Sequence, residues 1–341
     1  MPYDVMALFA TEYDLPSLLA WRSTSSTHRV HGSLLLERTR DQIVEHFVGR
    51  EDTMWLLNVL AHHRAVITGD AALAFMLRDL SVVGDTLHIA VDRVQGAELE
   101  EDLERWFRAV NVTPLPAVGQ PQPGPYEPTV HRFSLPNSTK IIISTSPNES
   151  AITCVATGIS TAYMNFLTRD SFGCAYPLLT LQRWAIAPRT DIDDRHSEER
   201  ARLRTLEDHH GFRSHEHAVP LVPRQFLIGL GEYDPRASHY PCLRHWYICP
   251  GQARFFGDAG SLVGFFNARE DSQDELSETG QAPFGPAVVW RLRWSVGCAR
   301  GCWARNRTLR HFATGWLSID HEPFTYSTGY VGLRIAHVVY W

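Results

Sequence analysis

The sequence predicts a mixed α/β (α+β) protein: a mixed sheet flanked by helices, with a helical cap before it and a strand-containing extension after it. Three observations support this fold class. Helical patterns fill about the first sixty positions, short apolar strands at Ala65–Thr68, Thr86–Val91 and Lys140–Ser144 alternate with helical segments, and strand patterns return after residue 255. Because helices and strands alternate only in part, the sheet is expected to be mixed rather than all parallel.

Length and composition are those of an ordinary globular protein. The chain has 341 residues, of which 44% are apolar and 21% charged, and a net charge of -6. A sequence pI near 6.3 argues against a generally basic surface, so nucleic acid is not an expected partner. No apolar run approaches the roughly 20 residues that cross a bilayer, and residues 1–11 lack the basic start of a signal peptide. We therefore expect a cytoplasmic or nuclear protein without a membrane partner.

Residues 1–62 are expected to form a cap of three helices. The sequence Asp14-Leu15-Pro16-Ser17 is typical of a helix start, because Pro fits the first helical turn. Apolar residues at helical spacing predict a second helix over about 28–48. The stretch 51–62 opens with acids, which suit a helix N-terminus, and is apolar behind them.

The rest of the chain is divided into a main α/β domain, residues 63–220, and a strand-rich extension, residues 221–341. The extension is either separate or continuous with the main domain. The charged, histidine-rich stretch 191–217 is interpreted as a solvated helix plus loop. Further expected elements are an amphipathic helix at 97–110, a proline-rich loop at 113–128, a strand followed by a helix at 149–168, and strands at 255–267, 288–296 and 330–341.

The stretch Ile67–Arg93 contains the most informative pattern. A strand meets Gly69, a helical segment follows, and a second strand occupies residues 86–91. Residues two apart on a strand share a face, so Thr86 and His88 lie on the face opposite the apolar residues. A glycine before a helix lets the backbone approach a phosphate, whose charge the helix N-terminus favours.

Two blocks of short motifs carry a family resemblance. The first block comprises Ile67-Thr68-Gly69-Asp70, Ala72-Leu73 and Thr86-Leu87-His88-Ile89. The second comprises Lys140-Ile141, Ser146-Pro147, Ser160-Thr161, Met164-Asn165 and Tyr176-Pro177 with Thr180. Together they resemble a group of uncharacterised fungal proteins with a nucleotidyltransferase-like domain, and the helices before residue 62 are similar to the F-box-like helices that often precede it. The resemblance covers about residues 14–190.

The resemblance implies a nucleotidyltransferase-like fold with nucleotide-binding candidates at Gly69, Asp70, Ser160 and Thr161. In this fold, two acids on the second strand and a third on a neighbouring strand hold divalent ions. Here Thr86 and His88 occupy the two acid positions, which makes them the catalytic candidates. Ser160 and Thr161 have a second interpretation, because Ser and Thr also cap helix N-termini.

The missing acids predict a catalytically degenerate protein that binds a nucleotide or a protein without turnover. Asp70 replaces a serine and would repel a triphosphate, and no acid lies between Glu127 and Glu149 to serve as a third ligand. Mg²⁺ prefers oxygen ligands, which a single imidazole does not replace. A protein partner is expected to use the N-terminal helices.

The alternative is an active nucleotidyltransferase with an unconventional Mg²⁺ site built around Asp70, Asp85, His88 and Asp92. Two features count against it. Asp85 points away from His88 on a regular strand, and Asp92 lies about 13 Å beyond His88. The retained Gly69 and helix layout keep this alternative open on the sequence alone.

Two further groups of residues were weighed as binding sites. Cys242, His245, Cys249, Cys298 and Cys302 are zinc-ligand types, but their spacing matches no standard zinc knuckle, so separate buried thiols without zinc are expected. The best basic patch consists of Arg300, Arg305, Arg307 and Arg310 around Trp303. Arginines beside an aromatic residue suit a phosphate and a stacked base, although a solvated edge strand or loop is the interpretation we favour.

Overall fold

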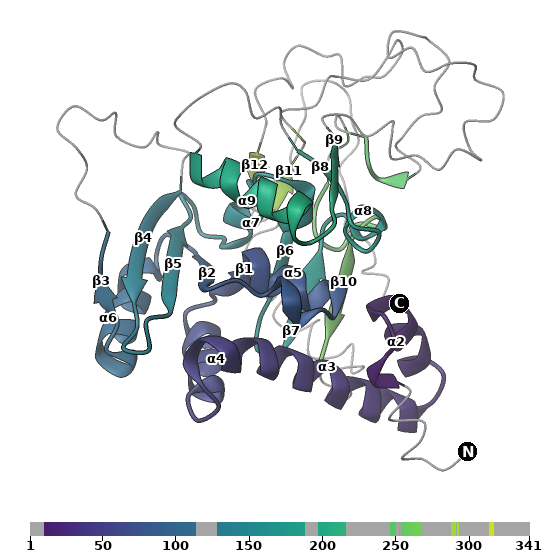
Figure 1. The fold of residues 1–341 in the computed structure, drawn as a ribbon, viewed down its shortest axis with the longest axis horizontal. Coiled ribbons are helices and arrows are strands. Elements are labelled where there is room, and N and C mark those ends of the chain that lie inside the picture. The colour runs from purple at the N-terminus through teal and green to yellow at the C-terminus, as the bar shows by residue number, and fades with distance from the viewer. Residues whose placement is uncertain are drawn as a thin grey trace, which may run out of the picture.

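A computed structural model describes residues 10–113, 128–187, 197–215, 246–249, 252, 254–266, 288–290, 292 and 314–316. These residues form a mixed α/β fold in which helices flank an eight-stranded mixed sheet (Figure 1), so the predicted class is confirmed. The described residues contain eight α-helices. None of these helices combines the length and apolar character needed to span a membrane.

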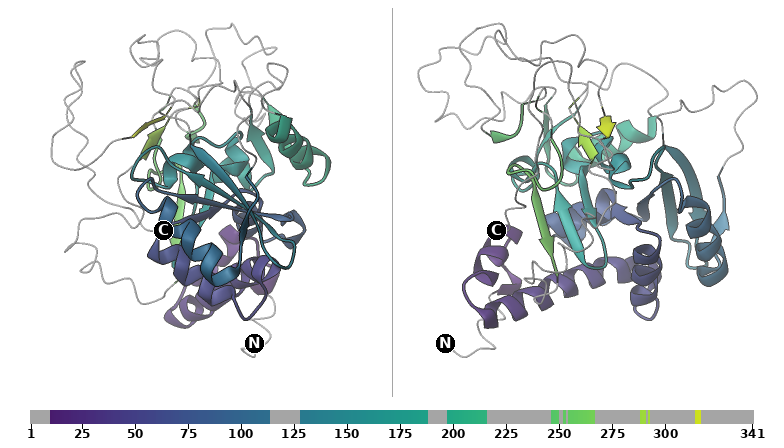
Figure 2. Two further views of the ribbon diagram at one scale, coloured as in Figure 1. Left: turned by 90° about the vertical axis from the view of Figure 1, so that its left-hand side faces the viewer. Right: turned by 180° about the vertical axis from the view of Figure 1, so that it is seen from behind.

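Three helices precede the sheet, as the sequence predicts: α2 (Leu15–Arg22), α3 (Ser26–Val48) and α4 (Thr53–His62). The side chains of Asp14 and Ser25 accept hydrogen bonds from free backbone N–H groups at the starts of α2 and α3. Gly49, with φ at +82°, ends α3. α3 runs along the lower side of the sheet in Figure 1 and in the rear view of Figure 2. Its buried residues Leu36 and Ile43 belong to the same apolar core as the sheet.

The main sheet has the strand order β10-β7-β6-β1-β2-β5-β4-β3. In chain order its strands are β1 (Val66–Thr68), β2 (Thr86–Val91), β3 (Val110–Asn111), β4 (Thr129–Ser134), β5 (Lys140–Thr145), β6 (Asn165–Leu167), β7 (Ser171–Cys174) and β10 (Leu262–Phe265). β2 pairs antiparallel with β1 and parallel with β5. The three strands that the sequence predicts at 65–68, 86–91 and 140–144 are therefore adjacent in the sheet, as expected.

The two faces of β2 have different surroundings. Leu87, Ile89 and Val91 on one face are fully buried, as is Ala90 on the other. The first three share an apolar core with residues of α4 and of α6 (Gly96–Phe107). Thr86 and His88 alternate with them and lie on the opposite face. There His88 is flanked by Thr68 of β1 and Ile142 of β5.

The sequence predicts a strand followed by a helix over 149–168, and this predicted order is wrong. The structure has α7 (Ile152–Ala156), then a 3-10 turn (Thr161–Tyr163), and then β6. β6 pairs with β1 and β7 in the middle of the sheet. These long-range pairings override the local helical pattern of the segment. The predicted helix at 97–110 exists but ends at Phe107, where Arg108 takes a left-handed conformation.

The stretch 191–217 contains more ordered structure than the predicted solvated helix and loop. The stretch contains α9 (Ser197–Asp208) and β9 (Arg213–His215). The strand before it is β8 (Trp184–Ile186). β9 pairs in parallel with β8. Leu203 and Leu206 of α9 are buried in the main core. α9 is therefore part of the packed domain, and Figure 1 shows it above α5 (Gly69–Leu77).

One described strand after residue 221, β10, belongs to the main sheet. β10, inside the predicted strand 255–267, pairs antiparallel with β7. β11 (Val288–Trp290), at the start of the predicted strand 288–296, pairs with β12 (Thr314–Trp316) in a separate two-stranded sheet. The predicted strand 330–341 and residues 114–127 of the predicted loop lie outside the described residues.

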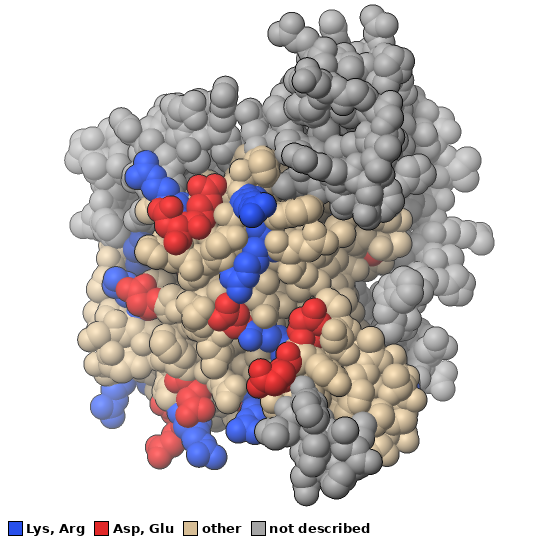
Figure 3. All heavy atoms as spheres, turned by 45° about the vertical axis from the view of Figure 1, so that its right-hand side comes forward, with Lys and Arg blue, Asp and Glu red and all other residues tan. Residues whose placement is uncertain are grey.

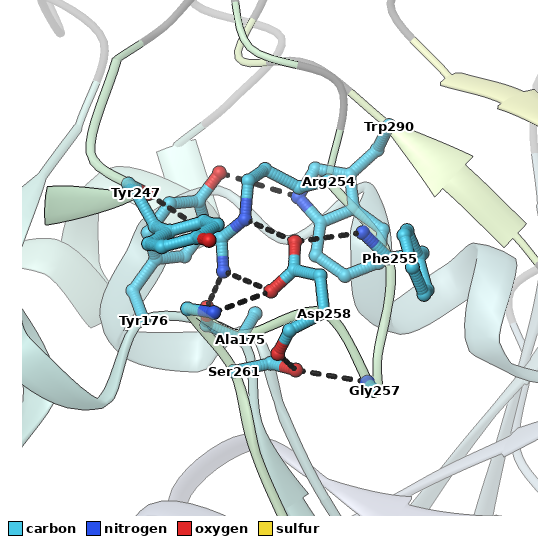
Figure 4. A network of polar contacts seen from close by, with 10 residues as sticks. Ala175, Tyr176, Tyr247, Arg254, Phe255, Gly257, Asp258, Ser261 and Trp290 are labelled. Atoms are coloured by element: carbon cyan, nitrogen blue, oxygen red, sulfur yellow. Dashed lines mark hydrogen bonds and ion pairs between the residues drawn. The ribbon is translucent and has the colours of Figure 1, made fainter. Parts of the chain in front are cut away.

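A buried arginine links several of these elements (Figure 4). The fully buried Arg254 pairs with Asp258 at 2.5 Å and donates to the carbonyl of Ala175 at 2.7 Å. It also donates to the carbonyl of Tyr247, and its guanidinium lies 4.6 Å from the Tyr176 ring centroid. Its backbone exchanges two hydrogen bonds with Trp290 of β11. A buried charge is tolerated when it is fully paired and hydrogen-bonded in this way.

Candidate functional site

Gly69 lies at the junction between β1 and α5. Its φ of +69° is in the left-handed region, which favours glycine over residues with a Cβ. Thr68, the residue before it, pairs with His88 across the sheet. The predicted layout of strand, glycine, helix and strand is confirmed, and it places Gly69 beside His88.

Arg202 of α9 packs directly against Gly69. A Cβ placed on Gly69 would lie 3.0 Å from Arg202 Nη2 and 3.0 Å from His88 Cδ2. The guanidinium and the imidazole therefore converge on this glycine from two different elements. Sequence analysis missed Arg202. The spacing of Leu203 and Leu206 does indicate a packed helix, but it does not say which residue their neighbour contacts.

His88 is held in its neutral form. The pKa of His88 is lowered from 6.5 to about 3, mainly by burial and then by the positive charges of Arg202 and Arg132, while Asp85 opposes the shift. Arg132 lies on β4 opposite Ile142, which in turn pairs with His88. Cationic side chains thus flank His88 from α9 and from β4.

Asp70 occupies the first turn of α5 and faces protein groups. Burial and then the Asp70 carboxylate raise the pKa of Tyr163 well above its ordinary value. The Arg202 guanidinium lies 4.3 Å from the centroid of the Tyr163 ring, so Tyr163 contacts both charged groups. Burial lowers the pKa of His210, and Asp70 opposes that shift. The Asp70 charge therefore acts on Tyr163 and His210, and its Oδ1 is buried without a hydrogen-bond partner among the described residues.

The other acids proposed for a metal site lie elsewhere. Asp85 is exposed, accepts from the Thr86 hydroxyl at 2.9 Å and pairs with Lys140 at 3.2 Å. Its pKa is lowered, first by the hydrogen bond from Thr86. Asp92 is buried and accepts from the backbone N–H groups of Val94 and Gln95, both at 2.8 Å. In the part of the chain that the structure describes, no three His, Cys, Asp or Glu side chains form a group able to hold a metal ion.

Ser160 and Thr161 are fully buried, and both hydroxyls hold local structure. The Ser160 side chain accepts from the backbone N–H of Ala162 at 3.3 Å and caps the 3-10 turn, as the capping interpretation predicts. The Thr161 hydroxyl accepts from the backbone N–H of Ile186 at 2.9 Å. The structure thus places these two nucleotide-binding candidates inside the packed core and gives each hydroxyl a backbone partner.

The remaining candidates lie largely outside the described residues. These are Cys242, His245, Cys298 and Cys302 of the cysteine set, and all of Arg300, Arg305, Arg307 and Arg310. Cys249 is described and buried. Burial raises the pKa of Cys154 to about 12 and that of Cys174 to about 11, so neither is a reactive thiolate at neutral pH.

Basic and acidic side chains are interspersed on the face shown in Figure 3. The described part of this face therefore carries no extended surface of one charge. Comparison of the chain with protein-family models, with curated proteins and with solved structures finds no match. The site is accordingly interpreted from its own geometry.

Proposed function

We propose that this protein is a catalytically degenerate member of the nucleotidyltransferase-like proteins and acts by binding a protein partner. The proposal is supported above all by Arg202, which packs against Gly69 beside a neutral His88. In an active enzyme of this fold, that glycine contacts a phosphate and the two neighbouring strand positions hold metal ions. Here the protein's own cation occupies the space beside the glycine.

The charges around His88 are the reverse of those that metal-dependent transfer needs. Two divalent cations require several carboxylates within reach. The corresponding strand positions carry Thr86 and His88, and Ile142 is the neighbour of His88 on β5. Arg132 and Arg202 add positive charge next to His88. This positive charge repels a divalent metal ion.

Binding of a protein is favoured over binding of a nucleotide. The Arg202 guanidinium already fills the space beside the backbone of Gly69 and stacks on the Tyr163 ring, and Asp70 adds a negative charge in the first turn of α5. Asp70 repels phosphate oxygens, and the hydroxyls of Ser160 and Thr161 are buried. The alternative metal site gains no support, because Asp85 and Asp92 are engaged at separate positions.

The test is a nucleotide-transfer assay on the purified protein. Each nucleoside triphosphate is supplied with Mg²⁺ or Mn²⁺, and pyrophosphate release and incorporation are measured. We expect no turnover, and no saturable heat when MgATP is titrated by calorimetry. The variant Asp70→Ser, Thr86→Asp, His88→Asp is expected to bind Mg²⁺ more tightly than the unaltered protein. Robust turnover that is lost in Asp70→Asn would contradict the proposal.

A further inference from the structure

Two tryptophans form an exposed pair on α4 and α6. Trp55 is 47% exposed and Trp106 is 54% exposed. Their ring centroids are 5.6 Å apart and their planes cross at 74°. Met54, adjacent in sequence to Trp55, is also exposed. Contiguous large apolar groups on a surface mark an interaction site more often than scattered ones do.

Polar contacts join the helices that carry this pair. Asp102 lies one helical turn before Trp106 on α6. The Asp102 carboxylate accepts from His63 Nε2 at 2.9 Å, and His63 Nδ1 lies 3.0 Å from Gln95 Oε1. The edge-to-face contact between the two rings orders both indoles before binding, which reduces the side-chain entropy lost when a partner docks on them.

The charges next to the pair favour a basic occupant. The charged residues three or four positions from either tryptophan are all acidic: Glu51, Asp52 and Asp102. Arg105 precedes Trp106 and lies 3.9 Å from Asp102, so it is drawn toward that carboxylate. The faces of tryptophan rings also attract the cations of Lys and Arg.

The size of the surface favours a short occupant. Two half-exposed tryptophans and a methionine offer on the order of 300 Å² of apolar area. A stable dimer buries about 800 Å² per partner, so this surface is too small to be the core of an interface with a second copy. A short segment needs less area, and exposed tryptophans are among the residues that dominate binding energy where a partner docks.

We infer that the tryptophan surface, defined as Met54, Trp55 and Trp106, docks a short amphipathic protein segment with an apolar anchor flanked by Lys or Arg. The inference rests on the proposed binding function and names the kind of partner. The surface lies on α4 and α6, whereas the groups beside His88 come from β1, β4 and α9. Figure 1 shows α4 and α6 at the lower left and α9 above them.

The experiment titrates the protein into a fluorescent helical peptide of leucine and lysine and follows its anisotropy. Its counterpart of leucine and glutamate tests the charge preference. We expect saturable binding of the basic peptide that weakens by about 30-fold in the double variant Trp55→Ala, Trp106→Ala. The matched control is Val30→Ala, Leu34→Ala, because these two exposed apolar residues lie on α3. The control variant is expected to bind as the unaltered protein does.

Several results would overturn the inference: no saturable binding, equal binding of the acidic peptide, or undiminished binding by the tryptophan variant. A dimer in sedimentation experiments that the tryptophan variant loses would show that a second copy occupies the surface. Circular dichroism checks that the variants fold. Trp106→Phe, which keeps an aromatic ring of smaller area, is a milder second variant expected to bind with intermediate affinity. Nucleotide turnover would contradict the proposed function whatever the peptide does, whereas the peptide result alone contradicts only this inference.

Discussion

Arg202 and His88 determine the character of the site at the scale of single residues. An imidazole in a partly exposed pocket normally titrates near neutral pH and can accept or donate a proton. Burial and two neighbouring cations remove this property from His88, so it acts as a neutral packing group beside Gly69. The sequence shows that the metal-binding acids are missing. It does not show that Arg202 packs beside the strand positions where they would lie.

The first prediction concerns Arg202→Ala. Because the Arg202 cation disfavours protonation of His88, its removal is expected to raise the pKa of His88 from about 3 toward, but not to, 6.5. Burial remains the larger cause and keeps the pKa low. NMR titration of the imidazole, assigned with His88→Gln, measures the change. Arg204→Ala removes an exposed arginine from the same helix and should leave the titration unaltered. An unmoved His88 pKa in Arg202→Ala would show that the two side chains are not coupled.

At the scale of elements, α4 and α6 are joined by His63, which follows the last residue of α4 and is buried between Gln95 and Asp102. The exposed ends of α4 and α6 bury little apolar surface and so gain little from the hydrophobic effect. The hydrogen bond between His63 and Asp102 fixes the position of the two helices relative to each other at these ends. Local sequence patterns found both helices but could not show this link, since His63 and Asp102 are far apart in the chain.

The second prediction is that His63→Ala lowers the free energy of unfolding by on the order of 2 kcal/mol, because it leaves a cavity at a buried position and removes the contacts of His63 with Gln95 and Asp102. The hydrogen bond from His63 is the largest cause that lowers the pKa of Asp102. Because the pKa of Asp102 is lowered on folding, the carboxylate stabilises the folded protein fully at pH values above 3.8, its ordinary pKa. This stabilisation is lost as the pH falls through the pKa of the folded state. Urea unfolding between pH 7 and pH 3 measures both effects, and His62→Ala, an exposed neighbour, is the control. Equal stabilities of the two variants would contradict the role of His63.

At the scale of the whole molecule, Arg254 connects residues between 175 and 290 that lie far apart in the sequence. Contacts of this kind explain why part of the fold could not be predicted from the sequence. Strands β1, β2 and β5 were predicted because each carries its own apolar pattern. The position of β6, the packing of Arg202 and the meeting of Trp55 with Trp106 depend on distant partners, and no local pattern encodes a distant partner.

The third prediction is that Arg254→Met destabilises the protein by about 3–5 kcal/mol, because it leaves the carboxylate of Asp258 buried without its partner. Chemical denaturation measures the loss. Arg213→Met, at an exposed position on β9, is expected to change the unfolding free energy by less than about 0.5 kcal/mol. The double variant Arg254→Met, Asp258→Leu should recover part of the loss, since it removes both charges together. A single variant as stable as the control would show that the network is incidental.

The ion pair between Asp85 and Lys140 has a consequence for the chemistry of the chain as a whole. Lys140 is the only lysine among the 341 residues. Its ammonium is exposed at the first residue of β5, next to Thr86 in the sheet register. An amine-reactive dye will therefore label one side chain, at a known distance in register from His88. By the same logic, any acetyl group or ubiquitin attached to a lysine of these residues is attached at Lys140, where it replaces the pairing with Asp85 and adds bulk at the edge of the site.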